Sequence, residues 1–600
     1  MKSIFKKLTI PKPVLTVLFL FLFLLFTASI VSYFRFQRFT KTLFQEEMKR
    51  DTLSMHYTLA NPEAYGIPQD HVALLPYSGK NETLQKHRVE DYCKTANTIL
   101  PLFPDKDSRL LLQLLQQQLS SREAEAEFSY YSEPLSPGSG IIANLPILLA
   151  EYTFRSEQDV KNYLTLLSQI PNYLKGIALY EKEKAKAGLF MSDCTADKII
   201  RQCYEIMDSQ KLLNDTHFLN TTFSERVQTL VGKKLLTPEQ AAHYQQQNHL
   251  LLFEQLMPAY EALGDEILSL KGNGKNPYGL SYLPKGKAYY SFLLKETTGS
   301  SRSITDLKQL LNAQIKKDAA ALSLLLKECP SLLSAPLKAE FPQMSSEEYL
   351  SDLQMRIAED FPPFPQTGMT PSHTVKKVSE SLQEYCSPAF YLTPPIDDIS
   401  ENSIYINEKD QSDALELYTT LAHEGYPGHL YQTVYHQLYQ QQENISPSRN
   451  LLHYGGYSEG WALYVEMQSY EYAKELLQEH GASKETLLLA DAIRLNRSIQ
   501  LCLYTLLDIS IHYDGATPET VTEYLRNFGI TEPSVAKDIY EYIVQEPANY
   551  PKYYVGYLEF LMLKDTAKQQ WKDSYSDMRF HRMILETGPC PFSVFWKQLS

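Results

Sequence analysis

One stretch near the N-terminus restricts the fold of this chain more than any other feature. Between Val14 and Phe34, 21 consecutive positions carry no charged side chain. An apolar helix of about 20 residues is long enough to cross the hydrocarbon core of a bilayer. The run is longer than the apolar core of a usual signal peptide, and no clear A-x-A cleavage site follows it. We therefore expect an uncleaved transmembrane anchor over residues 14–34, with a cleaved signal peptide as the alternative interpretation.

Basic residues on the two sides of this anchor predict its orientation. Four lysines precede it and three basic residues follow it closely, so the excess on the N-terminal side is small. The side richer in Lys and Arg normally faces the cytoplasm. We expect residues 1–13 to form a cytoplasmic tail, 35–55 a juxtamembrane helix and 56–600 the external body of a single-pass protein of the cell membrane. The Cys of a lipoprotein signal is missing from this region.

The composition is that of a folded, acidic body. Hydrophobic residues make up 44% of the chain and aromatic residues 12%, which is sufficient for a large core. The net charge is −14, and because residues 1–50 contribute +7, the remainder carries −21. Such a body repels phosphate backbones, so we expect no nucleic-acid partner. The seven Cys include no CxxC pair, which argues against a disulfide framework and against a Cys-based metal site.

Helix signals dominate residues 56–600, which we expect to form one large, mainly α-helical unit with a minor β element. Several helices are predicted from a capping residue or from a Pro at the first helical position. These signals lie at Thr237-Pro238-Glu239, Ser345 with Glu348, Thr517-Pro518-Glu519 and Glu532-Pro533. The best strand signal is at 403–407, and segments rich in Gly and Pro at 272–279 and 361–371 are expected to be loops.

A segment with an unusual His spacing ends an amphipathic helix that we predict over residues 411–424. It reads His423-Glu424-Gly425-Tyr426-Pro427-Gly428-His429. In a regular HExxH zinc helix the two His lie four residues apart on one face, with the Glu beside them. Here they lie six residues apart, and an unbroken helix would direct their rings about 120° apart. A regular helix therefore could not close both rings around one ion.

The residues between the two His favour a break in that helix. Pro427 has no N–H for the carbonyl of His423, and its ring clashes there. Gly425 and Gly428 permit backbone angles that other residues resist. We therefore expect a distortion between Gly425 and Gly428 that returns His429 to the side of His423. Capping and turn chemistry at a helix end is the alternative interpretation of this segment.

Glu459 is a third candidate ligand. It lies 30 residues after His429, in the segment 458–466 (SEGWALYVE), which starts another predicted helix. Two His from one segment and a Glu from a following helix form the His₂Glu set of catalytic zinc sites, which leaves a fourth position open. A carboxylate near a helix N-terminus is also favoured by the helix dipole, and the two roles are compatible.

The strings HEGYPGH and EGWALYVE resemble the signature of a bacterial family known as domain of unknown function 885, whose members resemble helical gluzincin metallopeptidases. Further blocks of this chain resemble blocks of the family. They lie at 279–298, 403–407, 506–519 and 579–592, so the resemblance covers about residues 56–600.

The resemblance implies that His423, His429 and Glu459 bind Zn²⁺ and that Glu424 is the general base. A peptidase also needs donors that stabilise an oxyanion. Candidates for that role are His581, which lies in a matched block, Tyr554, and further Tyr557, His512 and Arg494. With 42 Tyr in the chain, packing is the alternative role for any single Tyr.

Two further positions have a functional and a structural interpretation. Glu466 lies seven residues after Glu459, hence on the same helix face, where it could orient a ligand His. The alternative is an exposed carboxylate. Asp508 and His512 lie one helical turn apart and could form a functional or a structural pair.

Together these observations predict a membrane-anchored, zinc-dependent peptidase that hydrolyses short peptides by metal-activated water. Two alternatives stay open: a membrane-tethered metal- or peptide-binding protein without catalysis, and a zinc hydrolase of a non-peptide amide. The intact Glu424 argues against the first, because a non-catalytic protein has no need of a base. The expected partners are a peptide substrate and the membrane, and the oligomeric state is left open.

Overall fold

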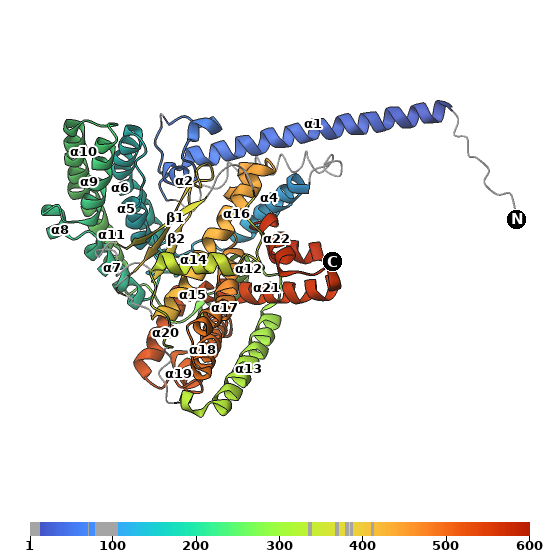
Figure 1. Ribbon diagram of the computed structural model, residues 1–600. Coiled ribbons are helices and arrows are strands. Elements are labelled where there is room, and N and C mark those ends of the chain that lie inside the picture. Colours follow the sequence, from blue (N-terminus) through green and yellow to red (C-terminus); the bar gives the residue numbers. More distant parts are fainter. Residues whose placement is uncertain are drawn as a thin grey trace.

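The computed structural model describes residues 12–69, 71–77, 106–333, 339–365, 371–378, 383, 388–407, 409 and 413–599. Within these ranges the protein is mainly helical, with one small three-stranded sheet and a long apolar helix at its N-terminal end (Figure 1). The predicted fold class is therefore confirmed.

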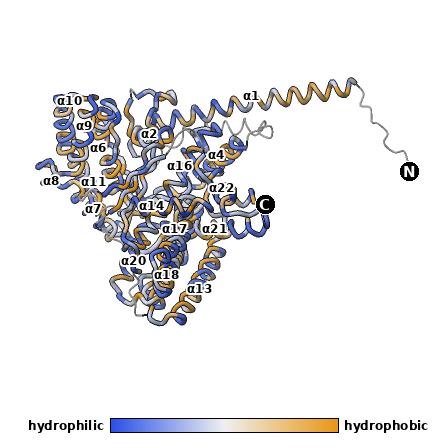
Figure 2. Tube along the Cα trace, in the orientation of Figure 1, coloured by the Kyte–Doolittle hydropathy of each residue, from blue (hydrophilic) through white to orange (hydrophobic). Residues whose placement is uncertain are grey.

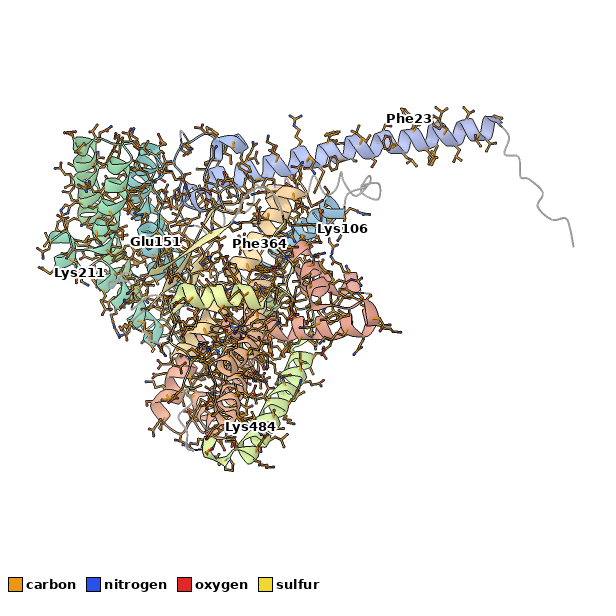
Figure 3. All side chains as sticks on the ribbon, viewed as in Figure 1. Phe23, Lys106, Glu151, Lys211, Phe364 and Lys484 are labelled. Atoms are coloured by element: carbon orange, nitrogen blue, oxygen red, sulfur yellow. The ribbon has the colours of Figure 1, made fainter. Side chains whose placement is uncertain are left out.

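The N-terminal helix α1 (Lys12–Arg50) is continuous and has two different halves. The large apolar side chains between Val14 and Phe34 are mostly exposed, and this half extends away from the body as a rod of apolar residues (Figure 2). Figure 3 shows side chains such as Phe23 pointing into open space. From Phe36 onward the helix packs on the body. α1 is long and apolar enough to cross a membrane, and an 18-residue window within it has a mean hydropathy of 2.8. The boundary predicted at residue 35, between the anchor and the juxtamembrane helix, lies inside α1 and is not a helix end.

One group of helices surrounds the smaller of two large hydrophobic cores, on the left of Figure 1. Its centre holds buried rings such as Tyr163, Phe223 and Tyr260. The group comprises α5 (Ile141–Ala150), α6 (Glu157–Lys186), α7 (Asp193–Ile206), α8 (Ser209–Leu213), α9 (Phe218–Gly232), α10 (Pro238–Leu251) and α11 (Met257–Leu270), with α2 (Thr52–Thr58) alongside.

The remaining helices surround the larger core, in which Trp461 is fully buried. They are α4 (Lys106–Glu125), α12 (Gly286–Thr298), α13 (Ile304–Glu328), α14 (Ser346–Arg356), α15 (Ala414–Glu424), α16 (His429–Gln442), α17 (Gly455–Glu479), α18 (Lys484–Ile509), α19 (Pro518–Arg526), α20 (Pro533–Gln545), α21 (Asn549–Trp571), α22 (Asp577–Thr587) and α23 (Phe592–Leu599).

The sheet joins the two cores. Its order is β1–β3–β2, with β1 (Ser372–Lys377) parallel and β2 (Ala389–Leu392) antiparallel to the central β3 (Glu401–Ile406). Successive side chains of a strand point to opposite faces. Accordingly, Ile404 belongs to the larger core and Tyr405 to the smaller one. The predicted strand at 403–407 is confirmed as β3, whereas the sequence analysis did not predict β1 or β2.

The helix N-termini that the sequence predicted are confirmed. Thr237 and Ser345 form capping boxes before α10 and α14, Thr517 caps α19, and α20 begins at Pro533. α14 ends at Arg356, before the expected loop at 361–371. Residues 272–279 form a loop, as predicted, and most of 361–371 lies outside the described residues. All five Cys in the described part of the chain are free thiols, while Cys93 and Cys386 lie outside it.

The two halves of α1 should differ in their contribution to stability. A protein that begins at residue 35 should unfold with nearly the same free energy as the full chain. One that begins at residue 51 loses the buried side chains Phe36, Leu43, Phe44 and Met48. Each fully buried apolar side chain of this size contributes about 1.5–3 kcal/mol. Chemical denaturation of the two proteins measures the difference, and equal unfolding free energies would contradict the packing described for α1.

Candidate metal centre

The predicted distortion between the two His is a complete break of the helix. α15 ends at Glu424 and α16 begins at His429, so residues 425–428 form a tight turn between two helices. The Nε1–H of Trp461 on α17 donates to the carbonyl of Pro427 over 2.9 Å and holds the turn against the core. As a result the rings of His423 and His429 converge, with centroids 4.9 Å apart. This part of the sequence analysis is confirmed.

Both glycines of the turn are required by close approach. A Cβ at Gly428 would lie 1.8 Å from the carbonyl oxygen of His423 and 2.4 Å from that of Ala422. A Cβ at Gly425 would lie 2.5 Å from a methyl group of Leu350. Carbon atoms cannot approach backbone oxygens this closely, so a side chain at position 428 would push α15 and α16 apart.

Glu459 completes a three-residue cluster from the first turns of α17. That helix begins at Gly455, three residues before the predicted start, and crosses α21 closely where Gly460 meets Gly556. The Oε2 atom of Glu459 lies 3.8 Å from His423 Nε2 and 3.5 Å from His429 Nε2. One ligand atom from each residue lies within 4.8 Å of the others, an arrangement that could hold a metal ion.

The spacing of these three atoms fits a small divalent cation. Bonds of about 2.0–2.1 Å in a tetrahedral zinc site place neighbouring ligand atoms about 3.3 Å apart. The two distances to Glu459 are close to that value. The described residues thus bring together the three ligands predicted from the sequence.

Glu466 contacts Nδ1 of His423, whereas Glu459 lies on the Nε2 side of the ring. Its Oε2 lies 2.9 Å from His423 Nδ1, while its Oε1 accepts a hydrogen bond from Arg497 Nε over 3.1 Å. A hydrogen bond at Nδ1 leaves Nε2 of the ring for the metal side. Glu466 is buried, so the interpretation as an exposed carboxylate is wrong and the predicted contact with His423 is present. Arg497 was not predicted, because no local pattern places it beside Glu466.

The charges in this cluster are strongly coupled. Burial alone would lower the pKa of His423, but the nearby carboxylate of Glu459 and the hydrogen bond with Glu466 raise it to about 10. Burial would raise the pKa of Glu466, but Arg497 and His423 lower it to about 2. The neighbouring rings of His423 and His429 likewise hold the pKa of Glu459 far below its usual range, against burial. These shifts favour ionised carboxylates at Glu459 and Glu466, and the negative charge around His423 favours a cation beside the ring.

Glu424 lies beside the cluster at the end of α15. Its side chain is 9% exposed, and its Oε2 accepts a hydrogen bond from the backbone N–H of Tyr391 in β2 over 2.9 Å. Burial raises the pKa of Glu424, against the charges of the two His. β2 therefore positions this carboxylate, a contact that the sequence analysis did not foresee.

The structure does not bring His581 or Tyr554 to the cluster. His581 is fully buried and donates from Nδ1 to the carbonyl of Asp360, while its Nε2 bonds the hydroxyl of Tyr464. The hydroxyl of Tyr554 bonds Ser498 over 2.8 Å. The polar atoms of His581 and Tyr554 therefore have hydrogen-bond partners within the larger core.

Other residues singled out in the sequence analysis also have partners elsewhere. His512 bonds the N–H of Leu280 and the carbonyl of Ile543, and Asp508 accepts from Tyr290 and from the N–H of Ala548. These two residues therefore have separate structural contacts and do not form a pair. Within the described ranges, Tyr557 and Arg494 make no hydrogen bond or ion pair with the cluster.

Tyr553 is the tyrosine that faces the cluster. Its ring centroid lies 6.5 Å from that of His423. Burial, followed by the charges of Glu459 and Glu424, raises its pKa well above the usual value, so the hydroxyl stays protonated. The sequence analysis pointed to this neighbourhood through Tyr554 and Tyr557, but not to Tyr553 itself.

Substitution of Gly428 should separate the two His. Gly428→Ala should lower the free energy of unfolding by several kcal/mol and weaken metal binding, because the new methyl group meets the carbonyl of His423. Gly232→Ala is the matched control, since a Cβ there meets nothing within 4 Å. Denaturant unfolding and metal titration test both variants. Equal behaviour of the two would contradict the close approach.

Comparison with known proteins agrees with this architecture. A family model described as bacterial protein of unknown function (DUF885) matches residues 64–599. A candidate lipoprotein from Colwellia psychrerythraea has the same fold at 20% identity, with a TM-score of 0.77 over 95% of this chain and 98% of that one. A candidate lipoprotein of unknown function from Shewanella oneidensis is 15% identical, with a TM-score of 0.59 over 94% of this chain and 99% of that one. No protein with a curated description matches. Because the family model covers nearly the whole body, the chain belongs to the family of bacterial proteins of unknown function DUF885.

Proposed function

We propose that the protein is a zinc-dependent peptidase acting on short peptides. The observation that carries the proposal is the convergence of His423, His429 and Glu459 beside the buried carboxylate of Glu424. Two imidazoles and one carboxylate, with no thiolate, are the donor set of catalytic zinc sites. A bound zinc ion would polarise the scissile carbonyl and make a water molecule more acidic.

The chain's own groups would then divide the proton transfers. Glu424 would accept a proton from the attacking water and deliver it to the departing amine. Its raised pKa suits that exchange, and the hydrogen bond from Tyr391 fixes one of its oxygens. Glu466 and Arg497 would keep the His423 ring in place during the reaction. A base held in this way has no use in a protein that binds a metal without catalysis.

The hydroxyl of Tyr553 would stabilise the oxyanion of the tetrahedral intermediate. It stays protonated, and its ring lies beside His423. We assign this role to Tyr553 in place of Tyr554 and His581, whose polar atoms are bonded elsewhere. His581 packs against Trp461, with ring centroids 5.6 Å apart, and would support the turn at 425–428 through that contact.

The exposed half of α1 would attach the enzyme to the membrane, with the body on the external side. Its length and composition suit one crossing. Two similar structures are those of candidate lipoproteins, which supports a location at the cell envelope. In this protein the apolar half of α1 would take the place of the lipid anchor of a lipoprotein.

Two substitutions should separate the base from the ligand. Glu424→Gln should retain about one zinc per chain and lose about a hundred- to ten-thousandfold in turnover, the range of proton-transfer groups. Glu459→Gln should lose zinc, because a neutral amide is a poorer ligand for a divalent cation. Elemental analysis and digestion of a peptide mixture measure both properties. Glu471→Gln, at an exposed position of α17, is the control. Zinc loss in Glu424→Gln with retention in Glu459→Gln would reverse the two roles.

A pair of neighbouring tyrosines tests the oxyanion donor. Tyr553→Phe should lower kcat about a hundredfold with little change in KM, because the lost hydrogen bond forms mainly in the transition state. Tyr554→Phe should leave turnover close to that of the natural protein and reduce stability by about 1–3 kcal/mol, since Ser498 loses a buried partner. Equal kinetic losses in the two variants would contradict the assignment.

A further inference from the structure

A cavity of about 450 Å³ lies next to the metal centre. Its walls follow α16 beyond His429, through residues such as Gln432 and His436, and include the end of β2. Two wall residues adjoin the centre directly. Tyr391 donates its backbone N–H to Glu424, and Ser458 precedes Glu459 in α17. The cavity wall therefore adjoins the cluster through Tyr391 and Ser458.

The wall contains a buried cation without a counter-ion. Arg449, in the short 3₁₀ helix Pro447–Leu451, is 3% exposed. Its Nη2 donates to the carbonyl of Thr587 over 3.1 Å, but its Nη1 has no hydrogen-bond partner. Throughout the described ranges, no carboxylate forms an ion pair with it. The thiol of Cys590 does not serve, because burial raises its pKa to about 12.

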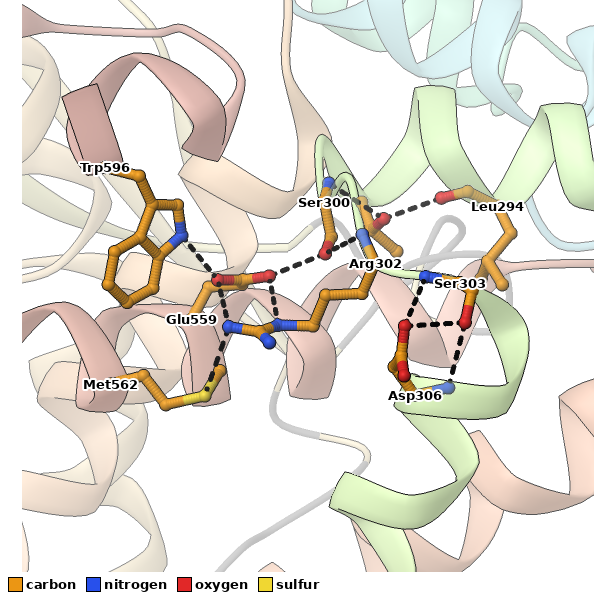
Figure 4. A network of polar contacts seen from close by, with 9 residues as sticks. Leu294, Ser300, Arg302, Ser303, Asp306, Glu559, Met562 and Trp596 are labelled. Atoms are coloured by element: carbon orange, nitrogen blue, oxygen red, sulfur yellow. Dashed lines mark hydrogen bonds and ion pairs between the residues drawn. The ribbon is translucent and has the colours of Figure 1, made fainter.

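The buried charge of Glu559 is a contrasting case. Figure 4 shows Glu559, which is 1% exposed and accepts hydrogen bonds from Arg302, Ser300 and Trp596. A buried charge without such partners is costly, so an unpaired guanidinium in a cavity wall indicates a ligand that supplies the anion.

Two more polar atoms of the same wall lack partners. They are the hydroxyl of Tyr457 and Oε1 of Gln437. With Arg449 they offer two donors and one acceptor. A peptide terminus supplies the complement, because its carboxylate accepts two hydrogen bonds and its backbone N–H donates one.

We propose that this cavity binds the free C-terminal carboxylate of a short peptide, with Arg449 as its charged partner. The inference rests on the proposed peptidase function and names its substrate class. His436 lies beside Arg449, whose charge acts on it, and is seven residues beyond His429 on α16. That spacing is a rise of about 10 Å, which an extended peptide covers in about three residues. The bond at the metal centre would therefore lie about three residues from the C-terminus.

A set of peptides tests this with the full-length, zinc-loaded protein. Three six-residue peptides share a sequence and differ at the end: a free acid, a carboxamide, and a carboxamide whose last residue is Glu. The free acid should be cleaved with about ten- to a hundredfold higher kcat/KM than the carboxamide, mainly through KM, and should release fragments of about three residues. Equal cleavage of acid and carboxamide would overturn the inference and leave the peptidase function intact. Preference for the Glu carboxamide over the acid would assign the cavity to a side chain instead. No cleavage of any peptide would overturn both proposals.

Variants link the preference to the cavity. Arg449→Met should bring the ratio of acid to carboxamide cleavage close to one. Tyr457→Phe, which removes a hydroxyl without a partner and should fold normally, should lower that ratio severalfold. Arg302→Met removes a buried ion pair outside the cavity wall and should keep the ratio of the natural protein. Retention of the full ratio in both Arg449→Met and Tyr457→Phe would overturn the inference.

Discussion

The close contact between Gly428 and the carbonyl of His423 is the constraint on which the candidate metal centre depends. It allows the chain to end one helix and begin another within four residues, so that two rings six positions apart meet. The hydrogen bond from Trp461 ties this turn to α17, which carries Glu459 and Glu466. Since one helix both braces the turn and supplies two carboxylates, the ligand geometry is fixed by rigid elements and not by loops.

The arrangement of charges around His423 is a second feature of this cluster. Two ionised carboxylates and Arg497 surround His423, whose pKa is raised to about 10. A cation that binds Nε2 must displace the proton of this ring, so metal binding and protonation compete for one position. The same low-dielectric surroundings that make an unpaired charge costly therefore favour occupation by a divalent ion. The wall of the cavity at Arg449 carries a positive charge, and for this reason we infer an anionic ligand there.

The sheet connects the centre to the second group of helices. β2 donates a backbone N–H to Glu424, and alternate residues of β3 enter the two cores. A shift of one residue in strand register would move every side chain of β3 to the wrong core. The position of Glu424 therefore depends on packing of the smaller core, although no residue of α5–α11 is among the proposed ligands.

The sequence by itself determined the local features of this protein. The uncharged run in α1, the capping boxes at Thr237 and Ser345, and the helix break at Gly425 and Gly428 are encoded within a few residues of each other, because they depend on local sterics and hydrogen bonds. The spacing of His423, His429 and Glu459 also pointed to a common site. Tertiary structure decided the rest. Arg497 behind Glu466, Tyr553 in place of Tyr554, and Arg449 without a counter-ion arise from the packing of distant helices, and no short-range pattern in the chain specifies which side chains such packing brings together.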